Sequence, residues 1–333
     1  MFRLHSLASA RSIAVLKSLL LSLSKISWAR RIVTRSSIAR RAASRFVAGD
    51  TIDDALAVIR DLNSKGLFAT LDHLGEHVSS AEEAESARDH YLSVIERIDA
   101  HKLKSNTSLK LSQMGLSIDY ELCLENVERI LRQAARFGIM VRIDMEEAPT
   151  VDRTIQIYRT LRSMGLANVG LVTQAYLRRS VGDVEELLAE GCSFRLCKGA
   201  YSEPADIAYT RMRDINAAFD RLTEILTDFA RANGAALSAS SGKVPPVTAV
   251  ATHDAGRIEF AKRRAREIGL PQQALEFQML HGIRSDLQFS LVQEGYPVRV
   301  YVPYGTEWYP YFFRRLAERP ANLWLFMATF LKV

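Results

Sequence analysis

The residues best suited to binding a small organic anion lie in the last helical segment of the sequence, Tyr309–Asn322. Tyr311, Arg314 and Arg315 follow one another at i, i+3 and i+4, so they share one face of an α-helix. Guanidinium groups bind carboxylates in bidentate fashion, and two adjacent arginines beside a tyrosine therefore predict a carboxylate clamp. A solvated, charged helix face is the alternative interpretation of this pattern.

A second set of polar residues stands where short, β-rich apolar runs end. These residues are Lys110, Asp144, Gln174, Arg195, Lys198, Thr252 and His253. Each alone has an ordinary structural explanation: Asp144 could cap a helix or pair with Lys110, and His253 could be a hydrogen-bonded core residue. Because buried charges without partners are costly, a cluster of such residues at one edge of a fold would instead indicate a ligand site.

The turn Lys198-Gly199-Ala200-Tyr201 adds backbone that a ligand could approach closely. Gly199 has no side chain to obstruct a ligand, and Lys198 supplies a cation beside it. This combination suits the phosphates or the ring edge of an anionic cofactor. A lysine-glycine pair at a strand end is, however, often only a turn.

The elements that must position these residues are eight strands that alternate with helix-compatible segments, after a first helix that begins at Thr51. Eight βα units in succession predict a (β/α)8 TIM-type barrel over residues 50–333, with its active site at the C-terminal ends of the strands. A doubly wound sheet is the alternative fold, although the glycine-rich motifs of dinucleotide and P-loop sites are missing. The polar stretch Ser238–Lys243 is expected to be a surface loop. The expected strands are Leu67–Leu71, Ser108–Leu111, Met140–Ile143, Val169–Thr173, Phe194–Lys198, Thr248–Thr252, Leu275–Gln278 and Val298–Val302.

The positive net charge of +6 is concentrated in residues 1–49, which we expect to form a basic helical extension. This segment holds eight Arg, two Lys and no Asp or Glu, whereas the rest of the chain has 34 basic and 38 acidic residues. The distribution argues against nucleic acid as a partner. The apolar run Ile13–Ile26 is too short for a transmembrane helix. Its acid-free surroundings fit a transit peptide, a helix lying on an anionic membrane or an ordinary packed helix pair.

The three cysteines, Cys123, Cys192 and Cys197, show neither a C-x-x-C pair nor any other metal-ligand spacing. We therefore expect no metal site and no disulfide framework, as is typical of a reducing compartment.

Seven motifs follow one another along the chain: RFVAGDT (45–51), SLKLSQMG (108–115), RIDMEE (142–147), RLCKGAY (195–201), ATHD (251–254), EFQMLHGIR (276–284) and YVPYGTEWYPYFFRRLAERPAN (301–322). Through these motifs the chain resembles the proline dehydrogenase family, specifically its short monofunctional bacterial branch, over about residues 46–327. Two positions depart from the family's pattern without disturbing a motif. Cys197 stands where the family more often has an aliphatic residue, and His281 occupies a variable position.

The resemblance implies an FAD across the C-terminal mouth of the barrel. Arg195 would lie near flavin N5 and stabilise negative charge on the reduced ring. The other residues implied in cofactor contacts are Met145, Gln174, Lys198, Gly199, Ala200, Thr252 and His253.

The resemblance also implies L-proline as the substrate, oxidised at the CH-NH bond to Δ1-pyrroline-5-carboxylate with a membrane quinone as electron acceptor. Arg314 and Arg315 would hold the proline carboxylate, Lys110 would lie beside it, and Asp144 would fix Lys110 as part of the catalytic set. Tyr201, Tyr301 and Tyr311 would wall the pocket. The product could pass to a pyrroline-5-carboxylate dehydrogenase.

Two further expectations concern the borders of the site. Glu76 would close it by pairing with Arg314 when substrate is bound, unless it is simply a surface carboxylate of a loop. Residues 1–45 would tune membrane contact and be dispensable for chemistry.

Alternative functions remain open. The same fold and flavin could act on hydroxyproline or another cyclic secondary amine, although the bulky Tyr301 ring argues against an added hydroxyl. A basic, non-catalytic membrane-binding scaffold is the alternative of a different class. The bacterial branch favours a cytoplasmic location, with peripheral contact at the inner membrane, and a mitochondrial location is the alternative.

Overall fold

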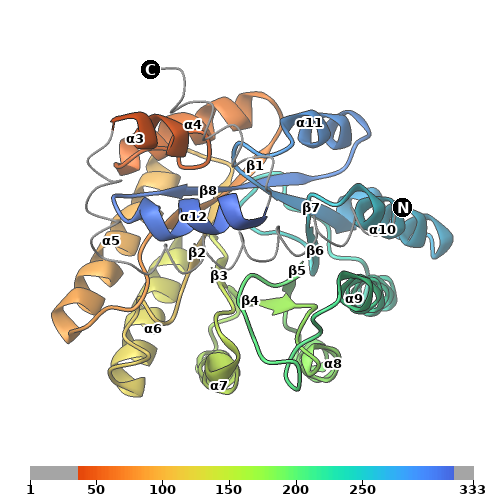
Figure 1. Cartoon of the computed structure of the whole chain (residues 1–333), viewed down its shortest axis with the longest axis horizontal. Coiled ribbons are helices and arrows are strands. Elements are labelled where there is room, and N and C mark those ends of the chain that lie inside the picture. The colour runs from red at the N-terminus through yellow and green to blue at the C-terminus, as the bar shows by residue number, and fades with distance from the viewer. Residues whose placement is uncertain (1–36, 319–333) are drawn as a thin grey trace, which may run out of the picture.

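A computed structural model describes residues 37–318 of the chain, and its centre is a closed barrel of eight parallel strands in the order β1 to β8. The predicted (β/α)8 barrel is therefore confirmed. Figure 1 shows the outer helices arranged around the strands, with α12 drawn across them. The strands are β1 (Phe68–His73), β2 (Ser105–Leu109), β3 (Val141–Ile143), β4 (Val169–Gln174), β5 (Phe194–Cys197), β6 (Thr248–Ala251), β7 (Leu275–Leu280) and β8 (Val298–Tyr304).

The α-helices of the described residues are α3 (Ser37–Ala43), α4 (Ile52–Ser64), α5 (Ala81–Ala100), α6 (Tyr120–Arg136), α7 (Val151–Ser163), α8 (Ser180–Ala189), α9 (Met212–Ala232), α10 (Ala255–Glu267), α11 (Ser285–Gln293) and α12 (Trp308–Glu318). From α5 to α12 each α-helix follows one strand, as a barrel requires, and α3 and α4 precede β1. Two short 3-10 helices, η1 (Ala148–Thr150) and η2 (Gln272–Ala274), precede α7 and β7. The helix expected from Thr51 is α4, and a capping box between Thr51 and Asp54 fixes its start.

Strand β2 was predicted three residues too late, and its sequence explains the error. Its residues, SNTSL, are polar almost throughout, yet all five are buried. Hydrogen bonds compensate for this burial: the Thr70 hydroxyl donates to Asn106 Oδ1 at 2.6 Å, and the Thr107 hydroxyl donates to the Leu71 carbonyl at 2.8 Å. Apolar periodicity cannot reveal a strand whose interior side chains are hydroxyls and amides.

The N-terminal end of the barrel is closed by a buried ion pair between Arg299 and Glu276, with Nε and Oε1 2.8 Å apart. Arg299 also donates to the carbonyls of Ala69 and Gly242, at 2.7 and 2.8 Å. Gly242 belongs to the stretch Ser238–Lys243, which is a loop before β6 as expected. The loop does more than cover the surface, because its backbone satisfies the buried guanidinium.

A second hydrophobic core lies apart from the barrel core and joins α3 to α12. Ala39 and Ala43 of α3 are almost completely buried in it, together with Phe46, Trp308 and Phe312. The chain that follows α3 is bound to the barrel as well, since the Ala48 amide donates to the Pro303 carbonyl at 2.8 Å. Residues 37–49, although part of the expected extension, thus pack against the helix that carries the two arginines.

None of the helices between residues 37 and 318 combines the length and the apolar character needed to cross a bilayer. The run Ile13–Ile26 lies outside the described residues.

Candidate functional site

The C-terminal mouth of the barrel holds a buried lysine between two carboxylates. Lys110 follows β2 directly, and its ammonium lies 3.0 Å from Asp72 Oδ1 and 3.5 Å from Asp144 Oδ2. Asp72 belongs to β1, and its side chain points into the barrel, where it is only 1% exposed. The pairing of Lys110 with Asp144 agrees with the sequence prediction, but Asp72 is the nearer partner and was missed.

Arg195 is held at the centre of the same group by three side chains. Its Nε donates to Gln278 at 2.6 Å, one terminal nitrogen donates to Asp144 at 2.8 Å, and the other donates to Ser108 at 2.9 Å. The guanidinium also lies 5.2 Å from the centre of the Tyr301 ring. With every nitrogen engaged, the cation is fixed in one orientation, which is what a preorganised electrostatic group needs.

Tyr301 completes the network from β8. Its hydroxyl donates to Asp144 Oδ2 at 2.8 Å, and Lys110 Nζ lies 3.5 Å from the same hydroxyl oxygen. Burial raises the pKa of Tyr301 well above its ordinary value, and Asp144 raises it further. The phenol therefore keeps its proton and acts as a donor at neutral pH.

Asp72 and Lys110 influence each other's protonation. Burial raises the pKa of Asp72 to about 6, against the opposing charge of Lys110. Burial alone would lower the pKa of Lys110, but Asp72, Tyr301 and Asp144 together raise it well above its ordinary value. The lysine is thus a permanent cation at the floor of the mouth, and Asp72 is the group that titrates.

The two arginines of helix α12 have different surroundings. Arg314 forms an ion pair with Glu76, with Nη2 and Oε1 2.5 Å apart and both side chains 19% exposed. Burial would raise the pKa of Glu76, but Arg314 outweighs this effect and lowers the pKa below its ordinary value. Arg315 is buried, with its guanidinium 5.1 Å from the centre of the Tyr311 ring.

Tyr201 lies among these groups. Burial raises the pKa of its hydroxyl, and the neighbouring charges include Glu76, Lys110 and Arg314. Of the residues predicted to bind the substrate, the structure brings together Lys110, Tyr201, Tyr301, Tyr311 and Arg314. Arg315 contacts the Tyr311 ring on its own helix. The structure also places the predicted gate residue, Glu76, against one of the two arginines.

The residues expected to contact a cofactor lie at the ends of four strands, with Met145 just after β3 and the others at or after β4, β5 and β6. Lys198 pairs with Asp254 at 2.6 Å across the ends of β5 and β6. The Ala200 amide lies 3.4 Å from Gln174 Oε1, while Thr252 and His253 follow β6 directly. His253 Nε2 accepts a hydrogen bond from the Leu280 amide at 2.9 Å, so one of its nitrogens has a structural role.

Gly199 cannot be replaced by a residue with a side chain without displacing its neighbour. Its φ angle is +120°, and a methyl group there would lie 2.1 Å from the Tyr176 ring. Gly199 and Ala200 are both exposed. Their exposed backbone lies beside the Lys198 cation, an arrangement that fits an anionic, flat cofactor.

Sequence reasoning missed three other members of the site: Asp72, Ser108 and Gln278. The expected first strand ended at Leu71, so Asp72, the next residue, was not assigned to the barrel. Ser108 and Gln278 belong to expected strands, where a small or amide side chain gives no indication of a functional site. An acid one position after an apolar strand would have been the signal for Asp72.

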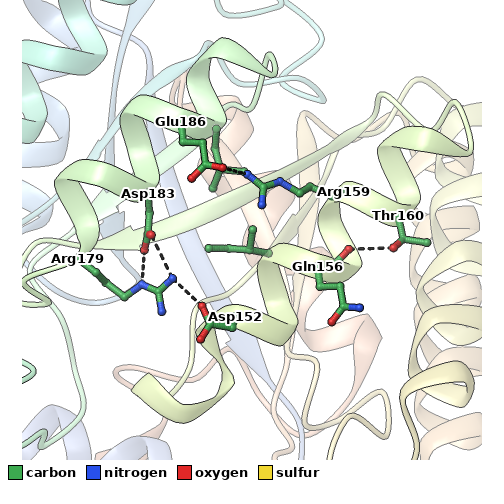
Figure 2. Close-up of a pocket in the computed structure, with 9 residues that line it drawn as sticks. Asp152, Gln156, Arg159, Thr160, Arg179, Asp183 and Glu186 are labelled. Carbon is green, nitrogen blue, oxygen red and sulfur yellow. Dashed lines mark hydrogen bonds and ion pairs between the residues drawn. The ribbon is translucent and has the colours of Figure 1, made fainter.

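One groove lies away from the mouth. It has a volume of about 340 Å³ and lies between α7 and α8 on the outside of the barrel. Figure 2 shows Arg179 between Asp152 and Asp183, and Arg159 directed at Glu186. Because these charges neutralise one another, we assign the groove to helix packing rather than to a ligand.

No group of three or more His, Cys, Asp or Glu residues that could hold a metal ion occurs within residues 37–318.

Comparison with known proteins identifies consistent relatives. The family model for proline dehydrogenase matches residues 55–324. Proline dehydrogenase 2 from Bacillus subtilis (strain 168) is 39% identical over 311 residues, which cover 93% of this chain and 96% of that protein. Proline dehydrogenase from Deinococcus radiodurans is 39% identical over 284 residues, covering 84% of this chain and 87% of that protein.

Solved structures agree on the fold. Proline utilization A from Bdellovibrio bacteriovorus superimposes with a TM-score of 0.74 at 24% identity, covering 84% of this chain and 33% of that one.

Proposed function

Since the chain belongs to the proline dehydrogenase family and resembles its short monofunctional members over most of their length, we propose that it oxidises L-proline to Δ1-pyrroline-5-carboxylate with FAD. The observation that carries the proposal is the set of charges at the mouth. Lys110, Asp144 and Arg195 form one ion-paired floor, and the charges of Glu76 and Arg314 lie near Lys110 and Tyr201.

Substrate binding follows from the charges of a free amino acid. The proline carboxylate is assigned to Arg314 and Arg315, whose planar groups bind carboxylates in bidentate fashion. The proline amine must be neutral when its CH-NH bond is oxidised. A permanently charged Lys110 favours that state, because a like charge nearby disfavours protonation.

The cofactor is assigned to the side of the mouth opposite α12. Gly199, Ala200 and Lys198 would accommodate its anionic part, and Met145, Gln174, Thr252 and His253 would border it. FAD would supply the two-electron acceptor for the ring carbon next to the proline nitrogen. The immobilised Arg195 cation would stabilise negative charge that develops beside it.

Tyr301 favours proline over hydroxyproline as the substrate. Its hydroxyl is held by Asp144, so the ring cannot turn aside to admit an added hydroxyl without breaking a buried hydrogen bond. Electrons would pass to a membrane quinone. A peripheral location at the cytoplasmic membrane face and transfer of the product to a pyrroline-5-carboxylate dehydrogenase belong to the same proposal.

The proposal is tested with the purified full-length chain. We expect bound flavin that is visible by absorbance, proline-dependent reduction of a quinone analogue, and weak activity on hydroxyproline. Arg195→Met should retain the fold but lose activity with proline. A colourless protein, or one that oxidises hydroxyproline as well as proline, would contradict the assignment.

A further inference from the structure

Two histidines and a tyrosine form a compact cluster where β1 and β8 end, and Glu76 follows the first of these histidines by three residues. His73 ends β1, Tyr304 ends β8, and these two residues are register partners in the barrel. The rings of His73 and His90, which lies on α5, are stacked with their centres 3.9 Å apart and an interplanar angle of 31°. The Tyr304 hydroxyl and His90 Nε2 lie 2.5 Å apart.

The protonation of the cluster is defined by its burial. Burial raises the pKa of Tyr304, so its hydroxyl keeps the proton and can donate to His90. Burial, His90 and Lys110 lower the pKa of His73 to about 4, and burial lowers that of His90. Both rings are therefore neutral at pH 7, and the stack carries no repulsion between like charges.

Two glycines allow close packing against this cluster, one in the loop before Glu76 and one in the loop that leads to α12. Gly75, directly before Glu76, lies so close to Gln113 that a methyl group there would be 2.6 Å from its amide nitrogen. The same amide nitrogen lies 3.4 Å from His73 Nδ1. On the other side, a methyl group at Gly305, at the start of the loop to α12, would lie 3.2 Å from the His73 ring.

From this arrangement we infer that the cluster His73–His90–Tyr304 is a positioning unit. It sets the distance between the loop that contains Glu76 and the loop 305–307 that leads to Arg314 on α12, and thereby the affinity for substrate. The inference rests on the proposed function of Arg314. The Leu74 amide, which donates to the Tyr304 carbonyl at 2.8 Å, joins the two loops at their base. Among the described residues, neither Asp144 nor Arg195 hydrogen-bonds to a side chain of the cluster, so the cluster is expected to act on binding rather than on the chemical step.

A double-mutant cycle tests the inference. His90→Ala should raise KM for proline roughly three- to tenfold and leave kcat within about twofold, because only a binding contact is misplaced. Glu76→Ala should raise KM in the wild type but add little to His90→Ala, since both changes disable the same ion pair. Additive effects on KM, or a fall in kcat alone, would overturn the inference.

Matched variants separate positioning from general stability. His101 caps the C-terminal end of α5, the helix that carries His90, and is hydrogen-bonded to Arg60. Because it lies far along the helix from His90, His101→Ala should leave KM unchanged. Tyr304→Phe keeps the ring but removes the hydroxyl, and it should give a smaller rise in KM than His90→Ala. An equal rise in KM for His101→Ala would assign the effect to helix stability and contradict the inference.

Hydrogen exchange provides a measurement that does not depend on proline oxidation. Amides of residues 74–79 and 305–307 should exchange faster in His90→Ala than in the wild type or in His101→Ala. Unchanged exchange in both loops would overturn the positioning role. A wild-type protein without proline oxidation would contradict the proposed function instead, and the exchange result would still decide the inference.

Discussion

Both ends of the barrel bury ion pairs, but the two ends use them differently. At the N-terminal end, Arg299 and Glu276 are 1% and 0% exposed, and the guanidinium also binds two backbone carbonyls. At the C-terminal end, Lys110 and Asp144 are 10% and 14% exposed and border the mouth. Burial of charge by itself therefore does not indicate a functional site. The end of the barrel and the remaining access to solvent distinguish a structural ion pair from one at a candidate functional site.

The largest effect is expected when the structural pair is broken. Arg299→Met leaves Glu276 buried without its cation, so the free energy of unfolding should fall by about 3–5 kcal/mol. The double variant Arg299→Met/Glu276→Leu should recover most of this loss, as measured by urea unfolding. The exposed pair of Lys65 and Asp61 supplies the control, because Lys65→Met should change stability by less than about 1 kcal/mol. A double variant no more stable than the single one would contradict this account.

The next largest effect concerns the second core, which supports the mouth from outside. Deleting residues 1–45 removes Ala39 and Ala43 from beneath Trp308 and Phe312, and we expect the free energy of unfolding to fall by about 2–4 kcal/mol. KM for proline should rise because α12 carries the arginines. Deleting residues 1–36 keeps Ala39 and Ala43 in the chain and should spare dye-coupled activity. If the longer deletion also spared KM, the sequence-based expectation for all 45 residues would hold.

A smaller, more specific effect is expected at the clamp. Arg315→Lys should weaken binding of a proline analogue that carries the carboxylate by about ten- to a hundredfold, since an ammonium cannot replace the planar, bidentate group. The flavin content and the free energy of unfolding of Arg315→Lys should change little, in contrast to the loss of stability expected for Arg299→Met. Normal binding by both Arg314→Lys and Arg315→Lys would identify a solvated helix face and make Lys110 the next candidate.

The smallest effect should be a change in pH dependence. The kcat/KM of the wild type should fall as the pH decreases through about 6, because Asp72 gains a proton and releases Lys110. Asp72→Asn should lower kcat/KM at pH 8 by roughly three- to tenfold and abolish this limb of the profile.

Stability should respond to Asp72 with the opposite sign. The folded state holds this proton more tightly than the unfolded chain, so the contribution to stability is complete below the ordinary pKa of 3.8 and is lost as the pH rises through about 6. Asp72→Asn should therefore remove this dependence from urea unfolding measured between pH 4 and 8. An unchanged activity profile would exclude Asp72 as the titrating group.

The sequence by itself determined the barrel, the family and most of the residues at the mouth. Parallel βα units have a strong local signature, and their strand ends converge by topology, so Lys110, Asp144 and Arg195 could be expected to lie together without coordinates. The two arginines of α12 were similarly placed on one helix face by the helical repeat.

Only the tertiary structure decided which partners these residues have. Asp72 lies 38 positions from Lys110 in the chain, and the polar strand β2 shows no apolar period, so neither local pattern revealed the pair. The contact of α3 with α12 and the stacking of His73 on His90 likewise depend on elements far apart in sequence. Local propensity sets where elements begin and end, whereas side-chain partners are fixed by packing between elements, which no short stretch of sequence encodes.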